Sequence, residues 1–140
     1  METIICYTGG LARGNPGPAA IGVYVIDKAS NVLHKLVQTI GNSTDNFAEY
    51  NAVMVGLQTL IALFGPATKT TIIEVRLVSE LVKKQLNAEC QITDPGLVPM
   101  FIEIHNMRVE SFPHLTLTQV PPEQNKEIDL LVNGALDGIR

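Results

Sequence analysis

The amino-acid sequence predicts an α/β domain built on a five-stranded mixed β-sheet. The first forty residues have the β-branched, apolar character of successive strands, and helical segments alternate with short apolar strands in the rest of the chain. A hairpin meander followed by β–α alternation gives a sheet with antiparallel and parallel pairs, flanked by helices. With 140 residues, 46% hydrophobic and 17% charged, the chain is expected to form a single domain over residues 1–140.

The N-terminal part is predicted to form a three-stranded antiparallel meander. Residues 3–8 are apolar and β-branched and give the first strand, and a Gly/Pro-rich loop is expected over residues 9–18. Residues 20–27 and 31–40 give the next two strands. Only the short turn 28–30 separates them, so these two strands form a hairpin.

A long helix is predicted after the meander. Ser43 or Thr44 is a suitable N-cap, Asp45 lies in the first turn, and Gly65-Pro66 is a stop signal. The apolar residues follow the helical period and are expected to share one buried face. They are Phe47, Tyr50, Val53, Met54 and Leu57.

Two further strands are predicted at residues 71–77 and 115–120, joined by two helices. The first of these helices covers residues 79–86, and its inward side chains are expected to be Leu81, Val82 and Leu86. The second opens at Pro95 or Pro99 and runs to about residue 109.

A terminal helix is predicted over residues 123–139. Its apolar stripe consists of Ile128, Leu131, Val132, Ala135 and Leu136.

The composition limits the classes of function. The formal net charge is −4 and the sequence pI is about 5.3, which counts against a nucleic-acid partner without excluding an acidic metal-dependent nuclease site. Cys6 and Cys90 give neither a disulfide framework nor a zinc pattern, and Cys6 is expected to be buried. No apolar run reaches the ~18 residues of a membrane span, and the N-terminus lacks the basic start of a signal peptide. We therefore expect a cytoplasmic protein with no membrane partner.

Four local segments, in order along the chain, match the motifs of one enzyme family. The segments are Arg13–Ala19 (RGNPGPA), Asp45–Tyr50 (DNFAEY), Val78–Leu86 (VSELVKKQL) and Val120–Asp129 (VPPEQNKEID). They resemble the signature loop of type 1 ribonucleases H and that family's segments N-N-x-A-E-Y, D-S-x-L-V-x-x-Q-L and V-P-R-E-x-N-x-x-A-D. The resemblance covers essentially the whole chain and is closest to the compact bacterial and archaeal members, which lack a basic handle. It implies a ribonuclease H-like fold.

The resemblance also implies a set of metal-binding carboxylates, which this sequence only partly retains. Enzymes of this family cleave the RNA strand of RNA/DNA hybrids with two Mg²⁺ or Mn²⁺ ions held by converging carboxylates. Glu49 and Asp129 match two of these carboxylates, whereas Gly9 and Val78 stand where two aspartates are expected. The catalytic set is therefore degraded. Glu49 and Asp129 are expected to bind a metal weakly, if at all, and otherwise to persist as a first-turn acid and a surface helix residue.

Other acids are not expected to replace the missing pair. Glu80 lies two residues past Val78 and should face outward on its helix, and Glu74 should lie ~13 Å away along its strand. Two further departures affect the same edge: Gln119 stands where many members carry a histidine, and Pro122 replaces the arginine of V-P-R-E.

The positions that face substrate in the family are better preserved. The resemblance implies that these residues contact the backbone and 2′-hydroxyl groups of a hybrid, which is recognised by its shape. They are Asn15, Thr44, Asn46 and Ser79. The alternative is that Asn15 and Thr44 serve only turn and cap geometry.

The leading hypothesis is a ribonuclease H homologue that has lost, or nearly lost, hydrolysis and binds RNA/DNA hybrid or structured RNA weakly. Two alternatives stay open. One is a residually active, metal-dependent ribonuclease H. The other is a structural or protein-interaction module without a nucleic-acid role, whose protein partner the sequence does not identify.

Overall fold

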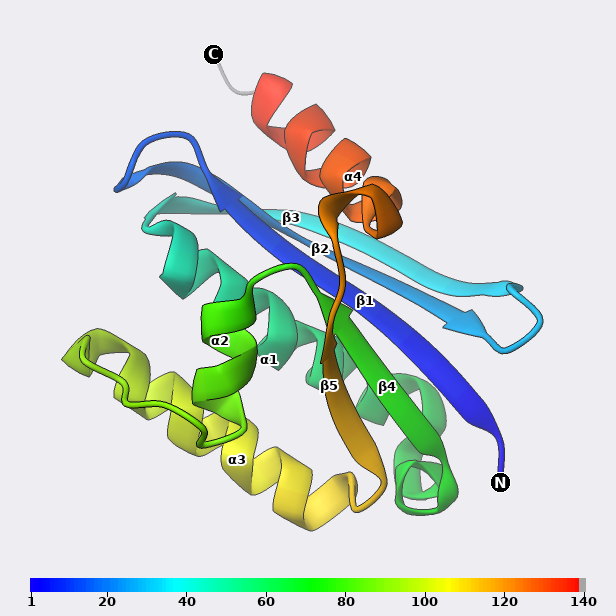
Figure 1. The fold of residues 1–140 in the computed structure, drawn as a ribbon. Coiled ribbons are helices and arrows are strands. Elements are labelled where there is room, and N and C mark those ends of the chain that lie inside the picture. The colour runs from blue at the N-terminus through cyan, green and yellow to red at the C-terminus, as the bar shows by residue number, and fades with distance from the viewer. Residues whose placement is uncertain (139–140) are drawn as a thin grey trace.

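The computed structural model describes residues 1–138 and has at its centre a five-stranded mixed sheet (Figure 1). The strands lie in the order β3-β2-β1-β4-β5, with β1–β2 and β2–β3 antiparallel and β1–β4 and β4–β5 parallel. Their bounds are β1 Thr3–Ala12, β2 Gly17–Asp27, β3 Val32–Ser43, β4 Ile72–Leu77 and β5 Leu115–Gln119. The predicted mixed sheet is confirmed.

Four α-helices cover the two faces of this sheet (Figure 1). Their bounds are α1 Asp45–Phe64, α2 Glu80–Leu86, α3 Val98–Ser111 and α4 Lys126–Asp137. Helices α1, α2 and α3 share one large core with the side chains of β1 that include Ile4 and Cys6. Helix α4 packs on the opposite face in a smaller cluster around Ile128. Because side chains alternate along β1, those on one face of the strand pack in the large core and those on the other face pack in the smaller cluster.

The loop expected over residues 9–18 is mostly strand, so this prediction was wrong. β1 continues to Ala12 and β2 begins at Gly17, with Gly9 opposite Gly22 in the antiparallel register. Gly9, Gly10 and Gly17 instead lie within these two strands, whereas Gly14, with a φ of 111°, lies in the turn. Only residues 13–16 form the turn.

Helix α1 begins and ends where the sequence indicates, but its buried face differs. The Phe47 N–H donates to Thr44 Oγ1 over 3.2 Å, and the helix ends at Gly65, whose φ is 53°. Phe47 is 38% exposed, contrary to prediction, because the neighbouring Ala48 turns toward the sheet. A small residue at 48 lets α1 approach β1 so closely that a side chain at Gly10 would overlap the Ala48 backbone.

Two other predictions about the helices need correction. Leu81 is 47% exposed, because the inward side of α2 is formed by Val82, Gln85 and Leu86 at the helical spacing. The terminal helix begins at Lys126 rather than at residue 123, since residues 122–124 form a 3₁₀ turn. Its predicted end at Ile139 lies outside the described residues.

The helical stretch Asp45–Thr70 is, within residues 1–138, the one segment long and apolar enough to cross a membrane by length and composition alone. The sequence-based expectation did not include it, because no uninterrupted apolar run reaches the length of a membrane span. In the fold its apolar side is occupied by the protein core, where Tyr50, Val53, Leu57 and Leu60 are each at most 1% exposed. The protein core thus buries 39% of the most apolar stretch of this segment.

Candidate functional site

A shallow pocket of about 240 Å³ lies where β1, α1, the end of β4 and the start of α4 meet. Its lining includes the four positions that the family resemblance assigns to metal-binding carboxylates, namely Gly9, Glu49, Val78 and Asp129. Residues 9 and 129 are far apart in the chain and meet because α4 folds back over β1 (Figure 1). The predicted convergence of these four positions is therefore observed.

Glu49 reaches the pocket from the second turn of α1 and is the most perturbed group there. Its Oε1 accepts a hydrogen bond from the Gly10 backbone N–H over 3.3 Å, and its Oε2 is buried with no hydrogen-bond partner among residues 1–138. Burial raises the pKa of Glu49 to about 7, the Gly10 N–H opposes this rise, and the Asp45 carboxylate adds to it. Near neutral pH this carboxyl group is therefore only partly ionised.

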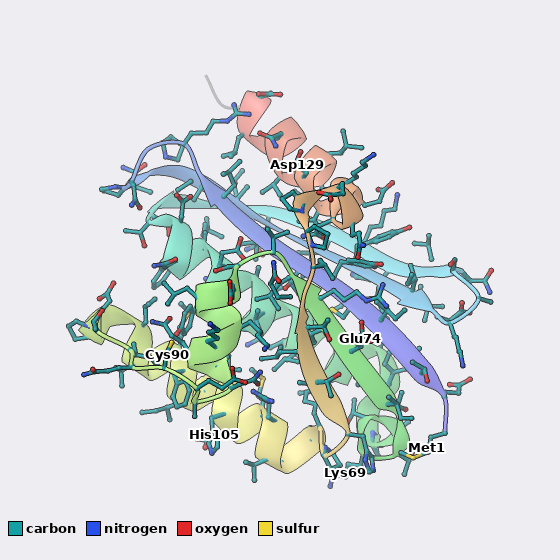
Figure 2. The ribbon with its side chains drawn as sticks, viewed as in Figure 1. Met1, Lys69, Glu74, Cys90, His105 and Asp129 are labelled. Atoms are coloured by element: carbon teal, nitrogen blue, oxygen red, sulfur yellow. The ribbon has the colours of Figure 1, made fainter. Side chains whose placement is uncertain are left out.

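Asp129 lies on the exposed side of α4 (Figure 2). Its Oδ1 accepts a hydrogen bond from Asn133 Nδ2 over 3.0 Å. The Asn133 Oδ1 in turn accepts from Arg13 of the β1–β2 turn over 3.0 Å, and Arg13 also pairs with Asp137 at 2.7 Å. Asp129 thus belongs to a polar chain that links α4 to the hairpin turn.

The space next to Gly9 is filled by a hydrocarbon side chain. An ideal Cβ placed on Gly9 would lie 2.5 Å from Ile128 Cγ2, and Ile128 is only 2% exposed. Val78, at the end of β4, adds a second hydrocarbon to the same pocket. Its backbone carbonyl accepts a hydrogen bond from Gln119 Nε2 over 3.3 Å.

The other nearby acids, Glu74 and Glu80, contact cationic side chains outside this pocket. Figure 2 shows Glu74 on β4, well apart from Asp129, and Glu74 accepts a hydrogen bond from Arg76 Nε. Glu80 is exposed and pairs with Lys84 at 2.9 Å. Neither residue lines the pocket.

This donor set does not fit a pair of hard divalent cations. Mg²⁺ requires near-octahedral oxygen coordination, and the pocket offers one buried, partly protonated carboxyl group and one exposed carboxylate beside two hydrocarbon side chains. Over residues 1–138, no three His, Cys, Asp or Glu side chains gather closely enough to hold a metal ion.

Three of the four expected substrate-facing residues make intramolecular caps. Asn15 Oδ1 accepts from the Asp45 N–H over 3.2 Å, and Thr44 caps α1 as described above. Ser79 Oγ accepts from the Val82 N–H over 3.2 Å and caps α2. Asn46 is exposed in the first turn of α1. Both helix starts border the pocket edge, since Glu49 and Val78 line it.

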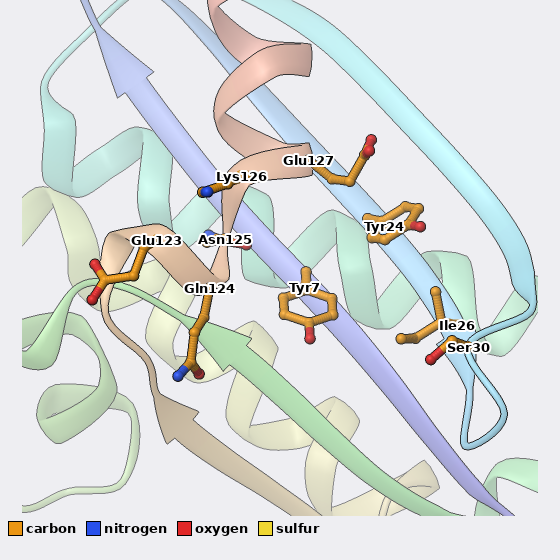
Figure 3. A pocket seen from close by; sticks show the side chains of 9 residues that line it. All are labelled: Tyr7, Tyr24, Ile26, Ser30, Glu123, Gln124, Asn125, Lys126 and Glu127. Atoms are coloured by element: carbon orange, nitrogen blue, oxygen red, sulfur yellow. The ribbon is translucent and has the colours of Figure 1, made fainter.

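A second pocket, of about 260 Å³, lies on the open sheet face beside α4 and is shown in Figure 3. Its floor is the cross-strand pair Tyr7–Tyr24, whose ring centroids are 6.0 Å apart. Arg76 donates to the Tyr7 hydroxyl over 2.8 Å, and Lys35 lies 5.4 Å from the Tyr24 centroid and 3.4 Å from Glu127. None of the predicted site residues lines this pocket.

Comparison with known proteins identifies the family. The family model described as "Reverse transcriptase-like" matches residues 7–135. The chain belongs to this family. A protein of Halobacterium salinarum named Ribonuclease HI is 36% identical over 131 residues, which are 94% of this chain and 63% of that protein. A bifunctional protein of Mycobacterium tuberculosis is 32% identical over 139 residues, 98% of this chain and 36% of its own length. This chain therefore spans less than two thirds of these curated relatives.

Solved structures of ribonuclease H1 proteins confirm the ribonuclease H-like fold. LC11-RNase H1, isolated from compost by a metagenomic approach, is 41% identical with a TM-score of 0.92 over 98% of this chain and 97% of its own. The same protein in complex with an RNA/DNA hybrid gives a TM-score of 0.90 over 96% of each chain, at 41% identity. RNase H1 of Halobacterium salinarum is 34% identical with a TM-score of 0.88, covering 98% and 99% of the two chains. The chain is thus a homologue of ribonuclease H1 proteins.

Two residues of this family member matter at the site but were not singled out from the sequence. Asn125 is 6% exposed, donates through Nδ2 to the Thr8 carbonyl over 3.3 Å, and leaves its Oδ1 without a partner. Ile128 fills the space beside Gly9. The sequence could have pointed to both residues. The resembled segment V-P-R-E-x-N-x-x-A-D has an asparagine at position 125, which this chain keeps, and an alanine at position 128, which is isoleucine here.

Proposed function

We propose that this chain is a ribonuclease H homologue that has lost hydrolysis of RNA/DNA hybrids and retains weak binding to them. The observation that carries the proposal is the composition of one pocket, in which Gly9 and Val78 stand beside Glu49 and Asp129. Hydrolysis with two metal ions depends on a clamp that holds the attacking and leaving oxygens. Two carboxyl groups flanked by hydrocarbon do not supply that clamp.

The state of Glu49 supports the loss of hydrolysis. Burial raises the pKa of this group to about 7, so near neutral pH a cation competes with a proton for the Glu49 carboxyl group. In a site with several converging carboxylates, the metal charge and the carboxylate charges stabilise each other. Here Asp129 is the single remaining partner within the pocket, and it is exposed.

Retained binding is supported by the fold and by one relative. A homologue with 41% identity and a TM-score of 0.90 was crystallised with an RNA/DNA hybrid. In this chain Asn46 is exposed in the first turn of α1, where the family resemblance places a contact with the hybrid.

The charges near this edge make the proposed affinity low. Arg13 is paired with Asp137 at 2.7 Å, Lys84 with Glu80 at 2.9 Å, and Lys83 with Glu89 at 3.8 Å. Cations already paired with carboxylates release fewer counterions on binding a phosphate backbone. With a net charge of −4, the whole chain adds repulsion.

A cleavage assay tests the first part of the proposal. The protein is incubated with an RNA/DNA hybrid labelled on the RNA strand, in Mg²⁺ and in Mn²⁺, beside Halobacterium ribonuclease HI as the positive control. We expect intact RNA with this chain and cleaved RNA with the control. Metal-dependent cleavage that disappears in Glu49→Ala would overturn the proposed loss of hydrolysis and favour a residually active enzyme.

A binding assay tests the second part. The affinity for a fluorescent hybrid is measured over a range of salt concentrations, with duplex DNA of the same sequence as the control. We expect weak binding to the hybrid that falls further as salt rises. No affinity for the hybrid at low salt would contradict retained binding and favour a protein-interaction module.

A further inference from the structure

The Ile128 side chain packs over two glycines of adjacent strands. Gly9 of β1 and Gly22 of β2 are opposite each other in the antiparallel register. A Cβ on Gly9 would lie 2.5 Å from Ile128 Cγ2, and a Cβ on Gly22 would lie 3.4 Å from Ile128 Cδ1. The first distance requires a shift of Ile128, whereas the second is close to ordinary van der Waals contact. Ile128 therefore occupies the space of a side chain at residue 9 specifically.

We infer that Gly9 and Ile128 are a coupled pair, and that Ile128 is the residue that closes this edge to a carboxylate at position 9. The inference deepens the proposed function and rests on it for its meaning, because it assigns the closure of the former metal edge to one packing contact. The contact between Ile128 and residue 9 can be tested by measuring the thermal stability of variants, without an activity assay.

The rigidity of Ile128 supports the coupling. Isoleucine is β-branched, and its χ1 angle is strongly restricted in a helix, so Cγ2 does not swing away freely. Helix α4 cannot easily move as a whole, because Val132 and Leu136 lie in the same buried stripe, each 3% exposed. Asn125 also ties the start of α4 to the Thr8 carbonyl of β1.

Compared with the resembled family pattern, residue 9 of this chain is smaller and residue 128 is larger. The pattern has an aspartate at position 9 and an alanine at position 128, whereas this chain has glycine and isoleucine. In the pattern, the larger side chain of the pair is at position 9. In this chain it is at position 128, and position 9 has no side chain. Because protein interiors are close-packed, such an exchange preserves density only when both changes are present.

A double-mutant cycle tests the inference with Gly9→Ala, Ile128→Ala and the double variant. Gly9→Ala probes the overlap without adding charge, and the φ angle of Gly9 lies outside the left-handed region. We expect Gly9→Ala to lower the Tm in the natural background. In the Ile128→Ala background the same change should leave the Tm unchanged or raise it, because the new methyl group fills space and restricts the unfolded chain.

Two further variants keep the test decisive. Ile128→Leu moves the branch from Cβ to Cγ while retaining volume, and replaces Ile128→Ala as background if the latter does not fold. Gly10→Ala is the matched control, because a Cβ there overlaps the Ala48 backbone and not Ile128. Gly10→Ala should lower the Tm equally in every background.

The inference would be overturned if Gly9→Ala lowered the Tm equally in the natural background and in the Ile128→Ala background, or in the Ile128→Leu background that replaces it. This outcome is distinct from failure of the proposed function. A chain that cleaves hybrid but shows the coupling would contradict the loss of hydrolysis alone, and an inactive chain without coupling would contradict the role of Ile128 alone.

Discussion

The Gly10 backbone N–H donates a hydrogen bond to Glu49 Oε1 over 3.3 Å, and this contact joins β1 to α1 at the edge of the sheet. The other oxygen of the same carboxyl group is buried without a partner. A buried carboxyl group with one hydrogen-bond donor favours its neutral form. The pair therefore links the packing of α1 to the protonation of Glu49.

Glu49 should make the protein less stable as pH rises through neutrality. The pKa of Glu49 is raised by burial from 4.5 to about 7, so between these values the folded state binds more protons than the unfolded state. Its stabilising contribution is complete below about pH 4.5 and is lost as pH rises through about 7. Glu49→Gln should flatten this dependence and raise the free energy of unfolding above pH 7 by about 2–3 kcal/mol.

Urea denaturation of the natural chain and of Glu49→Gln, from below pH 4.5 to above pH 7, measures the effect of Glu49 on the free energy of unfolding. Glu80→Gln is the control, because the pKa of the exposed Glu80 is lowered by its hydrogen bond with Lys84. A pH dependence that is the same in Glu49→Gln and in the natural chain would show that Glu49 is not buried as a neutral acid.

Tyr50 and Gln85 form the second buried polar contact that can be tested. The Tyr50 hydroxyl donates to Gln85 Oε1 over 2.7 Å between α1 and α2. Tyr50→Phe leaves this amide oxygen without that donor and should lower the free energy of unfolding by about 1–3 kcal/mol. Tyr24→Phe, on the half-exposed opposite face of the sheet, should change it by less than ~0.5 kcal/mol. Equal effects in chemical denaturation would contradict the assignment.

The cap and contact roles at the start of α1 can be separated. Thr44→Ala removes the acceptor for the Phe47 N–H and should lower the free energy of unfolding by about 1 kcal/mol, whereas Thr44→Ser should preserve most of it. Asn46 is exposed, so Asn46→Ala should leave stability unchanged and weaken hybrid binding. Melting curves and hybrid titrations on all three variants decide the assignment. Unchanged hybrid affinity in Asn46→Ala would place the contact elsewhere.

Much of the fold could be predicted because it depends on local patterns. Strand and helix periodicity, the cap at Ser43 or Thr44 and the Gly65-Pro66 stop are signals within a few residues. The expected loop over residues 9–18 failed because glycine in an extended ladder has the same sequence signature as glycine in a turn. Phe47 and Leu81 were placed inward because periodicity does not say which of two adjacent apolar residues turns toward the core.

The family resemblance implied that Glu49 and Asp129 converge, and both residues line one pocket. The interactions that these residues make in the pocket could not be predicted. The contact of Ile128 with Gly9 joins segments more than a hundred residues apart, and the burial of Glu49 depends on how closely α1 approaches β1. Such features depend on tertiary distances, which no local spacing contains.

Restoring aspartates at positions 9 and 78 alone should not create an active enzyme. Gly9→Asp with Val78→Asp keeps Ile128 over the new side chain, so we expect a lower Tm and no metal-dependent cleavage. Adding Ile128→Ala should recover Tm relative to the double variant, and Mg²⁺ should then raise the Tm further, since a ligand that binds only the folded state stabilises it. A double variant that is stable and raises its Tm in Mg²⁺ would contradict this expectation.

The central claim is most directly tested by single-turnover cleavage of a labelled RNA/DNA hybrid with the natural protein in excess, in Mg²⁺ and in Mn²⁺. The account predicts that the rate of RNA cleavage equals that of Glu49→Ala and of the buffer without protein, in both metals. A metal-dependent rate above these two backgrounds, lost in Glu49→Ala, would contradict it.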